Sequence, residues 1–64
     1  RIELDSRGAP VELILLASPQ RILAETAAGQ AALPFEGEWM GEPENVIRIR
    51  LNPPAGETTL RLEW

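Results

Sequence analysis

Val46-Ile-Arg-Ile-Arg-Leu51 and Thr58-Thr-Leu-Arg-Leu-Glu-Trp64 alternate apolar and polar residues near the end of this 64-residue chain. Successive side chains of a β-strand point to opposite faces of a sheet, so the period of two predicts two strands, each with one face in a core. The intervening residues 52–57 contain two prolines and a glycine, which interrupt a strand and favour a turn. The two stretches therefore predict a final hairpin, with these residues facing inward: Ile47, Ile49, Leu51, Thr58, Leu60, Leu62 and Trp64.

Two further strands are expected at the beginning of the chain. Residues 1–5 alternate, with Ile2 and Leu4 on one face, and residues 6–10 then supply a turn that contains Gly8 and Pro10. Residues 11–17 are apolar on both faces, because Ile14 and Leu16 lie between other apolar residues. A strand of that kind is expected at the centre of a sheet or against a partner.

Residues 18–30 fit two interpretations. Ser18-Pro19 and Gly29 are typical of the start and end of a helix, so one alternative is an α+β fold with one short helix at about 18–28. However, the segment has no continuous apolar stripe and no capping box. Interpreted as a strand, residues 20–26 place Ile22, Ala24 and Thr26 inward, and the sequence favours this strand.

Residues 31–39 complete the predicted sheet, with Leu33, Phe35 and Trp39 on one side. Pro34 cannot donate a hydrogen bond to a neighbouring strand, so the edge of a sheet is expected here. Five to six short strands with regular turns predict a single all-β domain over residues 1–64, a small antiparallel β-sandwich or open barrel. The likeness to immunoglobulin-like modules is one of general architecture only, because the Cys-Trp-Cys spacing of true immunoglobulin domains is missing.

The composition excludes several classes of function. A formal net charge of -4 and a pI near 4.6 oppose electrostatic binding of nucleic acid, and no apolar run reaches the roughly 20 residues that cross a bilayer. Without Cys or His the chain has no disulfide and no usual zinc ligands, and either redox compartment is compatible with it. A 64-residue chain without these supports is expected to belong to a longer protein or an oligomer.

Catalytic side chains are also scarce. His, Cys, Lys and Tyr are all absent, and neither serine has a base to activate it. We therefore expect no enzymatic activity and no cofactor. The acidic residues between positions 36 and 44 offer oxygen ligands for calcium, but they lack the spacing of known calcium loops. We interpret them as a solvated loop that protects a sheet edge, and we expect no metal site.

The remaining candidates are residues for contact with a partner. Arg48, Arg50 and Arg61 are expected together on the outward face of the final hairpin, where they can grip an acidic partner or, as we favour, pair with carboxylates such as Glu3 and Glu63. Trp39 and Trp64 can stack on a sugar, although a place in the core or an interface is favoured. An exposed apolar patch is expected from the residues on the faces opposite the core: Ile14, Leu16, Leu23 and Val46.

These patterns predict a non-catalytic protein-interaction or accessory module that meets a protein partner or a second copy of itself. The alternatives are a carbohydrate-binding accessory domain that uses Trp39 or Trp64, and a fragment of a larger enzyme whose catalytic residues lie elsewhere.

Overall fold

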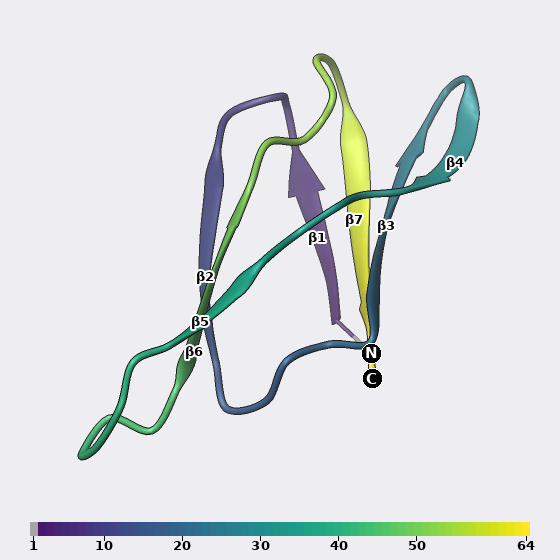
Figure 1. The fold of residues 1–64 in the computed structure, drawn as a ribbon. Helices are drawn as coiled ribbons and strands as arrows, with labels where there is room; N and C mark the ends of the chain where they lie inside the picture. The colour runs from purple at the N-terminus through teal and green to yellow at the C-terminus, as the bar shows by residue number, and fades with distance from the viewer. Residues whose placement is uncertain (1) are drawn as a thin grey trace.

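The computed structural model describes residues 2–64 and arranges them in two antiparallel sheets (Figure 1). The expected all-β class is confirmed, with seven strands in place of five or six. The strands are β1 (Ile2–Ser6), β2 (Val11–Leu15), β3 (Arg21–Thr26), β4 (Gly29–Ala32), β5 (Gly37–Trp39), β6 (Ile47–Leu51) and β7 (Thr58–Glu63). The four-stranded sheet has the order β1-β7-β3-β4, and the three-stranded sheet has the order β2-β6-β5.

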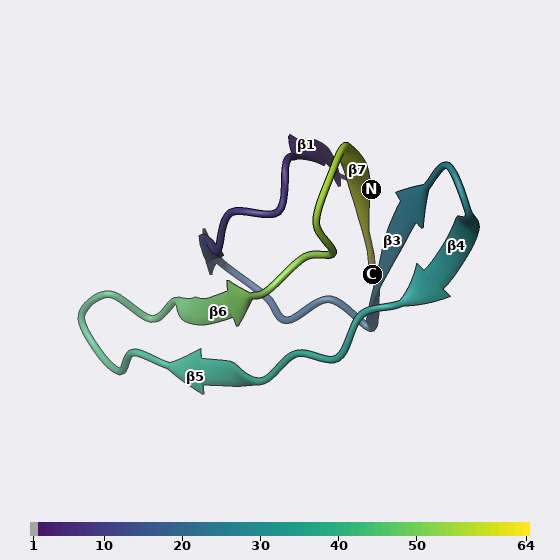
Figure 2. The same cartoon turned by 90° about the horizontal axis from the view of Figure 1, so that it is seen from above.

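The two sheets face each other, as the view from above shows (Figure 2). Only β3–β4 and β5–β6 are hairpins of consecutive strands within one sheet. Every other connection carries the chain from one sheet to the other. The fold is therefore held together mainly by pairs of strands that are distant in the sequence, such as β1 with β7 and β2 with β6.

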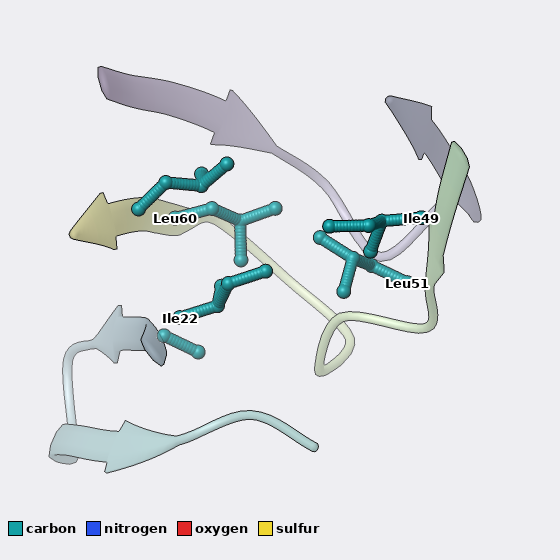
Figure 3. Packing of buried hydrophobic residues seen from close by; sticks show 6 residues of the cluster. Ile22, Ile49, Leu51 and Leu60 are labelled. Carbon is teal, nitrogen blue, oxygen red and sulfur yellow. The ribbon is translucent and has the colours of Figure 1, made fainter. Parts of the chain in front are cut away.

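The core lies between the sheets, where alternate residues of the central strands meet (Figure 3). It consists of six buried side chains: Ile22, Ala24, Ile49, Leu51, Leu60 and Leu62. All six were expected to face inward from the alternation of the sequence. Apolar residues of β1, β2, the start of β6 and the segment between β4 and β5 pack around this cluster and are only partly buried, because two small sheets cannot cover each other fully.

The alternative of a short helix at about 18–28 is wrong, and the favoured strand over residues 20–26 is confirmed. Residues 21–26 form β3, which pairs with both β7 and β4. This pairing buries Ile22 and Ala24, and that burial outweighs the local helix signals at Ser18-Pro19 and Gly29. Gly29, with φ at +124°, instead begins β4 after a tight turn at residues 27–28.

The predicted final hairpin is also wrong, because β6 and β7 belong to different sheets. Residues 52–57 do form a connection without regular structure, but Pro53 is buried and the segment crosses between the sheets. In the four-stranded sheet β7 pairs with β1 on one side and β3 on the other. Prolines and glycine show where a strand ends; they do not show which strand pairs next.

The doubly apolar strand β2 does not lie at the centre of a sheet. It is an edge strand, paired with β6 alone among the described strands. The prediction of an edge near Pro34 is confirmed, since β4 and β5 are the outer strands of their sheets and Pro34 lies in the segment between them. The β5–β6 hairpin extends beyond the four-stranded sheet (Figure 2).

Candidate interaction surface

The arginines on the outer faces of the sheets are paired with carboxylates on neighbouring strands. Arg48 Nη2 lies 2.9 Å from Glu38 Oε2, Arg50 Nε lies 3.1 Å from Glu12 Oε2, and Arg61 Nε lies 3.5 Å from Glu3 Oε1. In each pair the two residues are directly opposite in the strand register. Exposed cross-strand pairs of this kind stabilise a sheet only modestly.

The three arginines do not form one cluster, contrary to the sequence prediction. Arg48 and Arg50 lie on β6, whereas Arg61 lies on β7 in the other sheet. The arginines are separated because β6 and β7 do not form a hairpin. Glu63, expected as a partner for these arginines, instead accepts a hydrogen bond from Arg21 on β3. Glu3, the other carboxylate expected near the arginines, is the partner of Arg61.

The pair of Arg48 and Glu38 changes the protonation equilibrium of both groups. The hydrogen bond that Arg48 donates, followed by its positive charge, lowers the pKa of Glu38 below its ordinary 4.5. The same hydrogen bond and the negative charge of Glu38 raise the pKa of Arg48. Both groups therefore remain charged at neutral pH. The outer face of the three-stranded sheet thus carries two cross-strand ion pairs, Arg48 with Glu38 and Arg50 with Glu12.

Exposed apolar side chains gather at one end of the three-stranded sheet. We call this surface the apolar end; it consists of Ile14, Leu16, Trp39 and Met40, which are 55%, 87%, 63% and 36% exposed. Trp39 is directly opposite Ile47, which is in turn opposite Leu15, so a row of large apolar residues crosses all three strands on the inner face. This row lies where the hairpin extends past the four-stranded sheet (Figure 2), which explains why it is incompletely covered.

The predicted apolar patch is therefore only partly assembled. Ile14 and Leu16 lie at the apolar end, and half-buried Val46 is next to it because its carbonyl accepts a hydrogen bond from the Met40 amide. Leu23 is far from this group in the topology, since it lies on the outer face of the four-stranded sheet opposite Arg61 and Ala32. Met40 was not among the predicted residues, although its position directly after the alternating run that ends at Trp39 places it beside β5.

The two tryptophans are exposed at separate places. The Trp39 indole N–H donates to Asn45 Oδ1 at 3.1 Å, within the β5–β6 hairpin. The Trp64 indole N–H donates to the Ala17 carbonyl at 3.0 Å, and 48% of this residue is exposed. The expected place of a tryptophan in the core is therefore not found for either residue. Each ring is instead fixed at its polar edge, with much of its apolar surface facing solvent.

A shallow polar hollow of about 620 Å³ lies at the end of the four-stranded sheet where β1 and β3 end and β7 begins. Its lining includes Asp5, Glu25 and Glu57, with Arg7 as the cation and several hydroxyl groups around them. Within residues 2–64 no group of three or more His, Cys, Asp or Glu residues is arranged to hold a metal ion. No helix in the described part of the chain is long and apolar enough to cross a membrane.

Comparison of the chain with protein-family models, with curated proteins and with solved structures finds no match.

Proposed function

We propose that this chain is a non-catalytic, immunoglobulin-like accessory module that contacts a protein partner through its apolar end. The observation that carries this proposal is the concentration of four large, exposed apolar side chains at one end of the three-stranded sheet. Ile14 lies on the outer face of this sheet and Trp39 on its inner face, so the exposed apolar side chains occupy both faces of the same end. Large exposed apolar surface is typical of interaction sites. His, Cys, Lys and Tyr, which supply much of general acid-base and nucleophilic catalysis, are absent from the sequence, which favours binding over chemistry.

The order of the strands supports the immunoglobulin-like architecture. In immunoglobulin domains one sheet contains strands B, E and D in spatial order, and the other contains G, F, C and C′. Here β2-β6-β5 corresponds to B, E and D, and β1-β7-β3-β4 corresponds to G, F, C and C′. Six strands, β2 to β7, thus follow the chain order B, C, C′, D, E and F. The exception is β1, which occupies the position of G but precedes B in the sequence.

Met40 provides a direct test because it is the single methionine of the chain and lies at the apolar end. Its oxidation by dilute peroxide would be measured by mass spectrometry, first in the isolated chain and then in the complete protein or complex that contains the chain. Contact with a partner predicts that Met40 is oxidised several times more slowly in the assembled form.

A second methionine serves as the control for this footprinting. Ile2→Met adds one at β1, where Ile2 is 40% exposed, and its rate of oxidation should be the same in both preparations. Equal rates for Met40 in the isolated and assembled forms would refute the proposed contact surface.

Carbohydrate binding is a second candidate, favoured by the 63% exposure of Trp39 and by the fixed orientation of its ring. Stacking of a sugar ring on an indole face would quench or shift its fluorescence. Titration with cellobiose, galactose and N-acetylglucosamine would detect it, with Trp39→Phe as the control. An unchanged spectrum at saturating sugar would exclude Trp39 as a platform for these sugars.

A further inference from the structure

The free edge of β2 differs from the other sheet edges in the described part of the chain. No charged residue occurs from Leu13 to Gln20, and the side chains of Ile14 and Leu16 are largely exposed beside this edge. An edge strand presents unpaired N–H and C=O groups that can accept a further strand. Proteins usually protect such edges with charges or prolines, and β2 contains a single charged residue, Glu12, which is paired with Arg50.

The other three edges are protected or offer little surface. The β1 edge carries Glu3 and Asp5, and β5 contains Glu38 and follows closely after Pro34 and Glu36. The β4 edge is uncharged, but its sequence Gly-Gln-Ala-Ala has low strand preference and few large side chains to bury. The edge most suited to accept another strand is therefore that of β2.

We propose that β2 pairs with β2 of a second copy of this chain, antiparallel about a two-fold axis at Leu13. This deepens the proposed function, on which it rests, by naming the partner at one edge of the apolar end. The register places Leu13 opposite Leu13 of the second copy, Glu12 opposite Ile14, and Val11 opposite Leu15. It is the only antiparallel self-pairing that uses all five residues of the strand.

The charges on the outer face are compatible with this register. Glu12 and Ile14 both lie on that face, opposite Arg50 and Arg48 respectively. Across the junction one row of side chains would therefore contain Glu38, Arg48 and Ile14 of the first copy, followed by Glu12 and Arg50 of the second. No like charges are directly opposite in this row, so the pairing avoids the repulsion that opposes most contacts between two copies of net charge -4.

The strand order independently favours this edge. In immunoglobulin domains strand B has strand A as its outer neighbour. The corresponding strand here, β2, has no outer neighbour among the described strands. The second copy's β2 would fill that position and join two three-stranded sheets into one continuous sheet.

The size of the contact predicts a weak dimer. A strand of five residues is about 17 Å long and a sheet layer is about 10 Å thick, so each copy contributes roughly 170 Å² of projected contact. This is far below the roughly 800 Å² per partner of a stable interface. We expect a dissociation constant of about 0.1–1 mM, which is within the effective concentration when copies are linked or held side by side.

Sedimentation equilibrium over a concentration series tests the dimer. The unmodified chain should approach twice its monomer mass at high concentration, and Ile14→Glu should weaken association at least about tenfold, because it places a like charge directly opposite Glu12 of the second copy. Ile2→Glu, on the edge of the other sheet, is the matched control with the same change of net charge and should associate like the unmodified chain. A monomer at every concentration, or equal weakening by both variants, would overturn the proposal; circular dichroism would verify that both variants fold.

Cysteine cross-linking tests the register, since the chain has no cysteine of its own. Directly opposite residues of antiparallel strands have Cα atoms about 4.5–5.5 Å apart, within reach of a disulfide. Leu13→Cys should therefore form a disulfide-linked dimer under mild oxidation. Ile14→Cys should form it much more slowly, because the two residues are displaced by two positions. Faster cross-linking through position 14 would refute the Leu13 axis.

The two proposals fail in different ways. If Met40 is protected in the assembled protein but the isolated chain remains monomeric, the contact surface stands and the partner is another protein. If the chain dimerises but Met40 is unprotected, the contact is at the β2 edge and not at the β5 side of the apolar end. If the chain is monomeric and Met40 is unprotected, the proposed function fails.

Discussion

Replacing Leu60 by alanine tests whether the core between the sheets holds this fold together. Leu60 is completely buried on β7, opposite Leu4 of β1 and Ala24 of β3. The substitution removes about three carbon groups, worth about 2.4 kcal/mol at roughly 0.8 kcal/mol each, and leaves a cavity. Buried Leu→Ala changes have a total cost of about 3–5 kcal/mol. A 64-residue chain is expected to have a free energy of unfolding of only about 3–10 kcal/mol.

The assay is a urea titration followed by far-ultraviolet circular dichroism and tryptophan fluorescence. With a slope near 1 kcal/mol per molar urea, Leu60→Ala should lower the unfolding midpoint by about 3–5 M or leave the chain unfolded in water. Leu16→Ala is the matched control, because it is the same chemical change at a residue that is 87% exposed, and it should cost no more than about 0.5 kcal/mol.

A milder pair keeps the test informative if Leu60→Ala does not fold. Ile49→Val removes one methyl group from a fully buried side chain and should cost about 0.5–1.5 kcal/mol, whereas Ile14→Val should be close to neutral. Equal effects at the buried and exposed positions would show that the sheets do not pack as described.

Three further changes test local features. Gly8→Ala should lower the melting temperature more than Gly56→Ala: both glycines have φ near +90°, but only at Gly8 would the added methyl meet a backbone atom, at 3.0 Å. Glu38→Gln should reduce the pH dependence of stability, measured by thermal unfolding. Because the folded-state pKa of Glu38 lies below 4.5, its pair with Arg48 stabilises the fold above that pH and is lost as the pH falls through the lower folded value. Trp39→Phe should remove much of the acrylamide-quenchable fluorescence, and an unchanged quenching curve would contradict the exposure of Trp39.

The sequence predicted which residues face inward because alternation is a local property of the backbone. Ile49 and Leu51 on one strand, and Leu60 and Leu62 on another, are all buried as expected. The pairing of strands is not local. Pro53-Pro54 is equally compatible with a hairpin and with a crossing between sheets, and only packing against β1 and β3 selects the crossing.

The same distinction explains the outcome for the candidate site. Alternation alone indicated that Ile14 and Leu23 are opposite to core residues, and each does lie on an outer face. Whether these faces belong to one sheet depends on pairings between distant strands, and here they belong to two. Alternation therefore predicts which residues lie on an outer face, but it does not predict which of them share one sheet.

The pattern of β2 conflicts with its position, and this conflict gives the strongest functional signal in the chain. An edge strand with one solvated face usually alternates apolar and polar residues. In β2 only Glu12 follows that rule on the outer face, while Ile14 and the adjacent Leu16 do not. Neither residue contributes to the core of the monomer, so their apolar character is not explained by its folding.

The pairing of the charged residues also favours an apolar contact at the β2 edge. Arg21, Arg48, Arg50 and Arg61 are all engaged by carboxylates of neighbouring strands, so these cations already have partners within the fold. An association through the β2 edge would therefore depend on apolar burial and backbone hydrogen bonds more than on charge. It should persist at high salt, which screens surface ion pairs, whereas an association through the arginines should weaken.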